Sequence, residues 1–194
     1  MKKVLWIDTE TTGLHPKKNG LREIAFILNI DGITVYQEEF FIDPRTYNKS
    51  IEIDPKALEL SGKTIEDLDE YYDSRRVFAT VKSIFDEFVD KDDKDDYFIL
   101  AGYNVKFDNN FLKAWFEDNG AGEEWNKYIH YKVLDVFPLV ITLKHLGLIE
   151  TKNDKLKTVC EYFDIALEEH NAMEDIQATY NLYKTITDRF IRKS

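Results

Sequence analysis

The chain has 194 residues, of which 43% are hydrophobic and 14% aromatic, a composition that fits one folded domain over residues 1–194 and excludes a disordered chain. Its net charge of −11 argues against a broad electrostatic surface for duplex nucleic acid, but leaves room for a narrow groove that binds a short single strand through stacking and bound metal. No apolar run approaches the ~20 residues that cross a bilayer, and the N-terminus lacks the pattern of a signal peptide. The single cysteine, Cys160, predicts a buried thiol in a reducing cytoplasm.

The first predicted elements are strands. Residues 2–7 predict a buried strand, and residues 21–30 and 33–42 flank Asp31-Gly32, a dipeptide that favours a two-residue hairpin turn. Further strands are predicted over 97–101 and 130–134, and helices over 55–60, 74–89, 105–118, 135–146, 154–163 and 171–190, with a short helical start near Thr64. The predicted fold is therefore α/β, with a central mixed five-stranded sheet, an antiparallel meander followed by parallel strands, flanked by helices.

A charged loop interrupts this pattern, because residues 90–96 consist only of aspartate and lysine. Such a run suits a calcium loop, but the glycine that this kind of loop needs at its sixth position is absent. A solvated loop is therefore the prediction.

Two acidic residues close the first predicted strand. The apolar run over residues 4–7 leads into Asp8 and Glu10, and residues two apart in a strand point to the same side, roughly 6.5 Å apart. Like charges held together resist ionisation, whereas a divalent cation such as Mg²⁺ or Mn²⁺ favours both carboxylates. Thr9 is expected to point away, and Gly13 to let the chain turn from the strand end. The alternative is an ordinary pair of solvated acids.

A further acid begins the helix predicted over 105–118. Asp108, Phe111, Leu112 and Trp115 are spaced at i, i+3, i+4 and i+7, so Asp108 lies at the N-terminal end of an apolar stripe. A carboxylate that faces a core is costly unless it is paired or bound to metal, although the helix dipole offsets part of that cost. Charge complementation of the helix N-terminus is the alternative.

The last predicted helix brings a histidine and an acid. A spacing of five residues puts His170 and Asp175 on different faces of a helix, so both can reach one site only if His170 lies before the helix. Asn171 is a favourable N-cap, and Glu174 three residues later resembles a capping box, which predicts that the helix begins there. Taken alone, a histidine in this position is more often structural or exposed.

Together, these segments resemble the DnaQ-like (DEDDh) 3′-to-5′ exonucleases, which have the ribonuclease H-like fold, and the resemblance runs from Val4 to about Tyr183. Three motifs carry it in order: Asp8 and Glu10 within an Asp-x-Glu-Thr-Thr-Gly setting, Asn104 followed by Phe107-Asp108, and His170 followed by Asp175. Each motif alone is modest, but the complete ordered set is specific. The chain departs from the pattern at Tyr103, where many members carry histidine, and at Ser61-Gly62, where the family often has His-Gly.

The resemblance implies a two-metal mechanism, with two divalent cations, Mg²⁺ or Mn²⁺, about 4 Å apart on the phosphodiester. Asp8, Glu10, Asp108 and Asp175 would hold the cations, and His170 would be the general base toward the metal-bound water. The products would be nucleoside 5′-monophosphates, released from the 3′ end of single-stranded DNA or RNA. The implied substrate-binding residues are Thr11, Thr12, Leu14, Asn104 and Phe107.

Several alternatives stay open at this point. Phe107 could belong to the core rather than to a stacking surface, and Lys17, Lys18 and Lys106 could meet phosphates or simply be solvated. A catalytically silent nucleic-acid-binding or polymerase-associated module on the same fold is the alternative function, although no acid of the set is missing. The sequence does not distinguish DNA from RNA, nor a proofreading subunit of a DNA polymerase from a free-standing nuclease.

Overall fold

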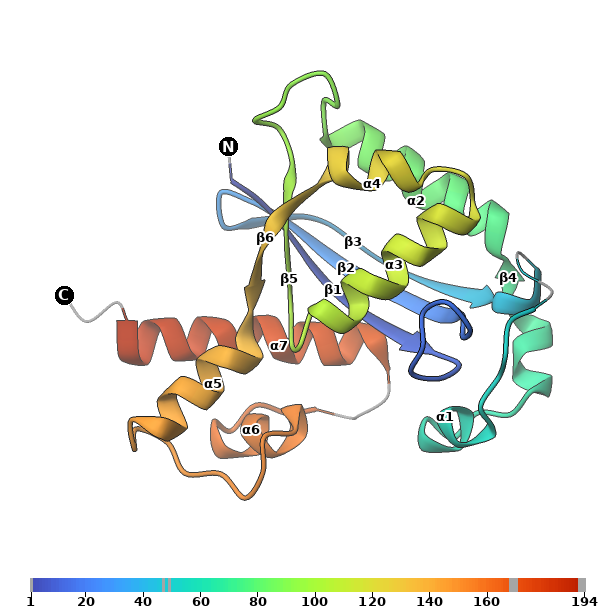
Figure 1. The fold of residues 1–194 in the computed structure, drawn as a ribbon. Helices are drawn as coiled ribbons and strands as arrows, with labels where there is room; N and C mark the ends of the chain where they lie inside the picture. Colours follow the sequence, from blue (N-terminus) through green and yellow to red (C-terminus); the bar gives the residue numbers. More distant parts are fainter. Residues whose placement is uncertain (1, 47, 49, 168–170, 192–194) are drawn as a thin grey trace.

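The computed structural model of the chain describes residues 2–46, 48, 50–167 and 171–191. Within these residues, the centre is one sheet of six strands in the order β4-β3-β2-β1-β5-β6 (Figure 1). The strands are β1 (Lys3–Thr11), β2 (Leu21–Ile30), β3 (Ile33–Asp43), β4 (Tyr72–Asp73), β5 (Phe98–Gly102) and β6 (Ile129–Asp135). β2 is antiparallel to β1 and to β3, whereas the pairs β3–β4, β1–β5 and β5–β6 are parallel. The predicted mixed α/β sheet, with its meander first, is confirmed.

The helices largely follow the predicted order. They are α1 (Pro55–Leu60), α2 (Ser74–Phe88), α3 (Lys106–Asp118), α4 (Gly122–Tyr128), α5 (Val136–His145), α6 (Leu156–Tyr162) and α7 (Ala172–Ile186), the last followed by a π-helical turn over Thr187–Ile191. The predicted number of five strands is one too low, because β4 has only two residues, too few to show an alternating pattern. α4 is also missing from the prediction, since it begins at Gly122, close to Gly120, and glycine normally interrupts a helical pattern.

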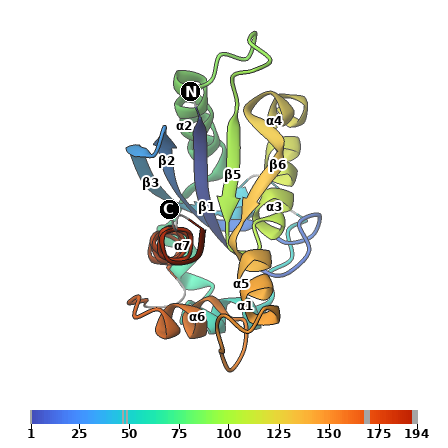
Figure 2. The same cartoon turned by 90° about the vertical axis from the view of Figure 1, so that its left-hand side faces the viewer.

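Helices cover both faces of the sheet (Figure 1, Figure 2). α2, α3 and α4 pack on one face, where their apolar side chains meet Leu5 and Ile7 of β1. α5, α6 and α7 lie on the other face, where Trp6 packs against two tyrosine rings of α7. Because successive residues of a strand alternate between the two faces, Asp8 and Glu10 follow Trp6 on the side of α7.

The end of β5 approaches the backbone of β1 closely. A Cβ atom added at Gly102 would lie 2.8 Å from the carbonyl oxygen of Ile7, the residue before Asp8. We therefore expect Gly102→Ala to force the two strands apart at this level and to lower the free energy of unfolding by about 1–3 kcal/mol. Urea denaturation followed by circular dichroism measures the change, and a variant as stable as the wild type would contradict this close approach.

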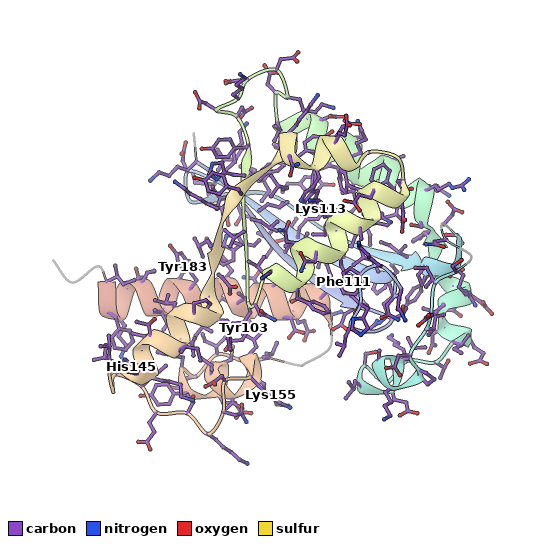
Figure 3. The ribbon with its side chains drawn as sticks, viewed as in Figure 1. Tyr103, Phe111, Lys113, His145, Lys155 and Tyr183 are labelled. Atoms are coloured by element: carbon purple, nitrogen blue, oxygen red, sulfur yellow. The ribbon has the colours of Figure 1, made fainter. Side chains whose placement is uncertain are left out.

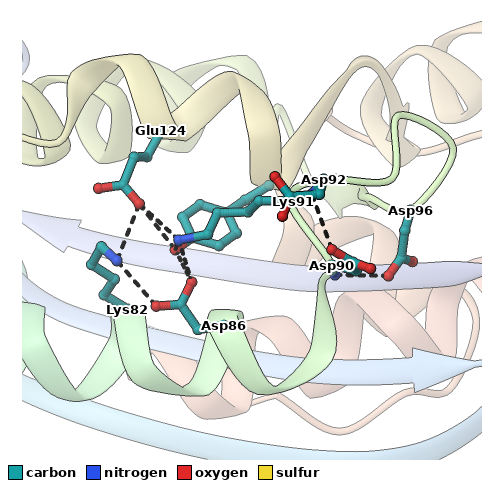
Figure 4. Close-up of polar contacts among 8 residues, drawn as sticks. Lys82, Asp86, Asp90, Lys91, Asp92, Asp96 and Glu124 are labelled. Carbon is teal, nitrogen blue, oxygen red and sulfur yellow. Dashed lines mark hydrogen bonds and ion pairs between the residues drawn. The ribbon is translucent and has the colours of Figure 1, made fainter.

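The aspartate-rich loop before β5 bonds to itself and to its neighbours (Figure 4). Asp90 Oδ1 accepts a hydrogen bond from the amide of Asp92 at 3.0 Å, and Asp96 Oδ2 accepts one from the amide of Asp90 at 2.9 Å. Lys91 turns back and binds Glu124 of α4 at 2.9 Å. These contacts and the exposure of residues 92–95 agree with the predicted solvated loop.

Cys160 lies on α6 and is free and buried, as predicted. Burial raises the pKa of its thiol to about 12, so the thiol stays protonated and poorly reactive at neutral pH. Within the described ranges, no helix combines the length and the apolar character that crossing a membrane requires.

Candidate metal centre and active site

Three carboxylates from opposite ends of the chain meet near the C-terminal end of β1. Asp8 and Glu10 of β1 and Asp175 of α7 each place one oxygen within 4.8 Å of the others. Carboxylate oxygens gathered in this way suit a hard divalent cation such as Mg²⁺ or Mn²⁺. The fold thus brings together three of the residues that the sequence predicts as metal ligands.

The first turn of α7 fixes where Asp175 enters this cluster. Asn171 is the N-cap, as predicted, and its side chain accepts a hydrogen bond from the amide of Glu174 at 2.9 Å. Glu23 of β2 accepts a second one, from the amide of Ala172, at 2.7 Å. Both contacts satisfy amides at the start of α7 that have no partner within the helix, and the carboxylate of Glu23 also suits the positive end of the helix dipole.

The fourth predicted carboxylate, Asp108, is buried in the first turn of α3. Its Oδ1 accepts hydrogen bonds from the amide of Thr9 at 3.0 Å and from the hydroxyl of Thr9 at 2.7 Å. Thr9 therefore contacts α3 while its neighbours on β1 contact α7. Asp108 is outside the group of three oxygens described above, but its charge raises the pKa of Asp8, which places the two carboxylates within electrostatic range.

Like charges crowd this site. Burial, the largest cause, and then the charges of Asp108, Asp175 and Glu10 raise the pKa of Asp8 well above its ordinary value. Burial also raises the pKa of Asp108 to about 7, although the hydrogen bonds from Thr9 act in the opposite direction. A bound divalent cation would favour the ionised carboxylates and offset this cost. The donor atoms and their electrostatics therefore fit a metal centre.

The bond between Thr9 and Asp108 leads to a testable expectation. In Thr9→Val a methyl group replaces the hydroxyl donor, so Asp108 loses one of the two hydrogen bonds that orient it. We expect the affinity for Mn²⁺ to fall about 10-fold, since contacts that orient metal-binding groups typically contribute about 10- to 100-fold. Calorimetric titration measures this affinity, and Thr142→Val, which removes an exposed hydroxyl bonded within α5, is the matched control. Equal affinities in both variants and the wild type would contradict the role of Thr9.

The turn after β1 contains Thr11, Thr12 and Leu14, which the sequence predicts as substrate-binding. Thr12 is fully buried, and its hydroxyl donates to the Glu52 carbonyl at 3.1 Å and accepts from the amide of Gly20 at 2.9 Å. This hydroxyl therefore forms its hydrogen bonds within the protein and not at the surface. Thr11 is half-buried, and its hydroxyl donates to a carbonyl in the same turn. Leu14 is 75% exposed, which leaves its apolar side chain available to a ligand.

Gly13 gives this turn its conformation, as predicted. Its φ of +156° lies in a region that other residues rarely adopt, and an added Cβ would lie 2.4 Å from the side chain of Asn19. Asn19 in turn accepts a hydrogen bond from the amide of His15 at 2.9 Å. The glycine therefore allows the turn to close directly after the acidic pair.

Asn104 and Phe107 connect β5 to α3. Asn104 has a φ of 61°, a left-handed conformation that asparagine tolerates, and its amide donates to Asp135 Oδ1 at 2.9 Å. Phe107 is half-buried, with its ring centroid 4.9 Å from that of Phe111. The core and the stacking roles weighed for Phe107 are both compatible with this position.

Tyr103, where many members of the resembled family carry histidine, ties the end of β5 to the neighbouring helices. Its hydroxyl donates to the carbonyl of Asp154 at 2.5 Å, and its ring packs against Phe137 of α5. Figure 3 labels Tyr103 together with Lys155, the residue that follows Asp154. Burial raises the pKa of Tyr103 above its ordinary value. The residue therefore stays neutral and supports the packing below the site.

The predicted general base, His170, lies outside the described residues. The chain is described again from Asn171, the N-cap of α7. Sequence reasoning missed Arg22 and Glu23, which are buried beside Glu10. The signal that could have found them is the presence of two adjacent charged residues in a largely apolar predicted strand.

The fold and the carboxylate cluster define a ribonuclease H-like α/β protein with a candidate metal centre. Residues 5–183 match the model of the RNase_T exonuclease family, and the chain therefore belongs to this family.

Relatives with curated descriptions are much longer than this chain. It is 30% identical over 189 residues to the PolC-type DNA polymerase III of Halalkalibacterium halodurans, a match that covers 95% of the chain and 12% of the relative. It is 31% identical over 179 residues to the PolC-type polymerase of Latilactobacillus sakei, covering 91% of the chain and 11% of the relative. The chain thus spans about a tenth of the length of these relatives.

Solved structures of E. coli Exonuclease I share the fold. The complex with a dT13 oligonucleotide has a TM-score of 0.80 at 21% identity, covering 97% of this chain and 42% of that one. A zinc-bound form of its complex with single-stranded DNA has a TM-score of 0.81 at 21% identity, covering 99% and 42%. These similarities confirm the ribonuclease H-like fold.

Proposed function

We propose that the chain is a metal-dependent 3′-to-5′ exonuclease that hydrolyses phosphodiester bonds of single-stranded nucleic acid to nucleoside 5′-monophosphates. The observation that carries the proposal is the convergence of Asp8, Glu10 and Asp175 within 4.8 Å in a member of an exonuclease family. Exonuclease I, which shares the fold, has been seen with bound oligonucleotides, which supports a single strand as the substrate.

In this proposal the four acids hold two divalent cations, Mg²⁺ or Mn²⁺. Asp8, Glu10 and Asp175 provide the clustered oxygens, and Asp108 is positioned beside them by Thr9. Bound cations would polarise the phosphodiester and lower the pKa of the attacking water. By holding the cations, the carboxylates would determine where the scissile phosphate binds.

His170 is the proposed general base. It precedes the N-cap of α7, and Asp175 enters the site from the first turns of the same helix. An imidazole with an ordinary pKa near 6.5 can take a proton from water at neutral pH.

Substrate contacts are assigned to the surface around the acidic pair. The exposed Leu14 and the half-buried Phe107 offer apolar surfaces on which the terminal base or sugar packs. The exposed Asn104 lies in the turn between β5 and α3, just before Phe107. Thr11 belongs to the same surface, whereas Thr12 shapes the turn from inside. Stacking of this kind tolerates any base, so it suits an exonuclease without sequence preference.

The polymerase relatives favour a second role for the same chemistry. Because this chain matches PolC-type DNA polymerases over 95% of its own length, it could act as a proofreading partner of a DNA polymerase. We also propose a cytoplasmic location, which the similarity to bacterial DNA polymerases supports.

A labelled single strand tests the proposal. With Mg²⁺ or Mn²⁺, a 5′-labelled DNA or RNA oligonucleotide should give a ladder that shortens from the 3′ end, and a 3′-labelled one should release its label first as a mononucleotide. EDTA should stop both reactions. A strand that stays intact with either cation, or that shortens from its 5′ end, would contradict the proposed activity. Matched DNA and RNA strands in the same assay establish the preferred sugar.

A further inference from the structure

A β-bulge in β2 brings an arginine to the edge of the carboxylate cluster. Glu10 of β1 is opposite Glu23, but the next residue, Thr11, is opposite Leu21, so Arg22 is an extra residue in the ladder. A bulge turns two successive side chains toward one position on the partner strand. Arg22 and Glu23, which would otherwise point to opposite faces, can therefore both reach Glu10.

Arg22 joins two carboxylates in the protein interior. Its side chain is completely buried, with Nη2 2.8 Å from Glu10 Oε2 and Nη1 3.4 Å from Glu23 Oε2. Its Nε has no hydrogen-bond partner among the described residues. A buried ion pair is often no more stabilising than an apolar side chain of similar volume, so general stability is a weak reason for this arginine.

Glu23 continues the chain of contacts to α7. Its second oxygen, Oε1, accepts a hydrogen bond from the amide of Ala172 at 2.7 Å, in the helix turn that precedes Asp175. One connected path therefore runs from Glu10 on β1 through Arg22 and Glu23 to the first turn of α7. The two ends of this path, Glu10 and α7, carry two of the three clustered carboxylates.

We propose that Arg22 is a positioning residue that sets the spacing between Glu10 and Asp175 at which a divalent cation binds. The inference rests on the proposed metal-dependent function. Carboxylates of like charge repel, and the Glu10 side chain, 19% exposed, could otherwise turn toward solvent. The planar guanidinium holds two carboxylates in one geometry, which the single ammonium of a lysine cannot do equally well.

The sign of a binding change separates positioning from simple charge. As a nearby positive charge, Arg22 repels a cation, so its removal should tighten cation binding if charge were its only effect. As a positioning residue it organises the ligands, so its removal should weaken binding. The two effects predict opposite outcomes for one substitution.

Titration calorimetry with Mn²⁺ tests this inference on the full chain. We expect Arg22→Met to bind Mn²⁺ about 10- to 100-fold more weakly than the wild type, and Arg22→Lys to be intermediate. The Mg²⁺ concentration for half-maximal strand degradation should rise in parallel, with turnover largely restored at saturating Mg²⁺. Arg45→Met is the control, because Arg45 also joins two carboxylates, Asp43 and Asp69, at 2.7 Å each. Neither of these carboxylates belongs to the cluster of Asp8, Glu10 and Asp175.

The outcomes are distinguishable. Unchanged or tighter Mn²⁺ binding in Arg22→Met would overturn the positioning role, as would an equal loss in Arg45→Met. Absence of Mn²⁺ binding by the wild type would instead overturn the proposed metal-dependent function. Thermal melting by circular dichroism checks the fold of each variant; should Arg22→Met not fold, Arg22→Lys decides, and wild-type affinity in that variant would overturn the inference.

Discussion

Asp8→Asn is expected to reduce exonuclease turnover by about 10²- to 10³-fold or more, because it removes the carboxylate around which the other acids gather. In the same variant, the metal-free protein should melt at a higher temperature, on the order of 2–4 °C. The reason is that asparagine has nearly the same shape as aspartate but carries no charge against Asp108, Asp175 and Glu10. Loss of activity together with a gain of stability is the signature of a functional acid held in an unfavourable place.

Initial rates on a labelled single strand and thermal melting in EDTA measure both effects. Asp93→Asn, in the exposed loop before β5, is the control and should change neither quantity. Undiminished turnover in Asp8→Asn would remove this carboxylate from the active site, and with it the proposed mechanism.

The stability of the metal-free protein is expected to fall as the pH rises from about 5 to about 8. Burial raises the pKa of Asp8 well above its ordinary value and the pKa values of Asp108 and Glu23 to about 7. The folded chain therefore keeps protons that the unfolded chain, with ordinary pKa values of 3.8 and 4.5, has already lost. Stability from Asp108 and Glu23 is complete below about pH 4 and is lost as the pH rises through about 7, at a cost of a few kcal/mol for each of these two groups. Asp8 acts in the same direction, because its pKa is raised as well.

Divalent cations should reverse this trend. A bound cation favours the ionised carboxylates, so the gain in stability from Mg²⁺ should be larger at pH 8 than at pH 5. At a free Mg²⁺ concentration of 100 times the dissociation constant, this gain in the free energy of unfolding should be about 2.7 kcal/mol.

Asp86, outside the site, behaves differently. Burial acts to raise its pKa, but hydrogen bonds from Lys91, Tyr128 and Lys82 together lower it to about 2. The stability that Asp86 contributes is therefore lost only in stronger acid.

Urea denaturation at pH 5, 6, 7 and 8, with EDTA or with Mg²⁺, measures this linkage. The Glu23→Gln variant should show a shallower pH dependence in EDTA, because it lacks one of the three groups. A metal-free protein whose stability stays constant or increases over this range would contradict the raised pKa values.

Local patterns were sufficient to predict the parts of the site that depend on one element. Alternation along β1 places Asp8 and Glu10 on one face, and the N-cap preference of Asn171 fixes the start of α7. The apolar spacing after Asp108 predicts its burial at the start of α3. These residues follow from the period of a strand or helix, which the sequence carries directly.

The features that the sequence did not predict depend on contacts between elements. The adjacent charges in the strand over 21–30 single out Arg22 and Glu23, but the bulge itself is a property of the pairing between β1 and β2. The bonds from Thr9 to Asp108 join residues 99 positions apart, and the short strand β4 exists only because β3 lies beside it. Pairing of this kind is decided by tertiary packing, which local propensity does not report.

Anomalous diffraction from crystals grown with Mn²⁺ would locate the proposed metal centre. We expect a strong Mn²⁺ peak at about 2.0–2.2 Å from carboxylate oxygens of Asp8, Glu10 and Asp175, with Arg22 still bound to Glu10. A protein with no Mn²⁺ among these three acids at millimolar concentration, or with Mn²⁺ bound only elsewhere on its surface, would contradict it.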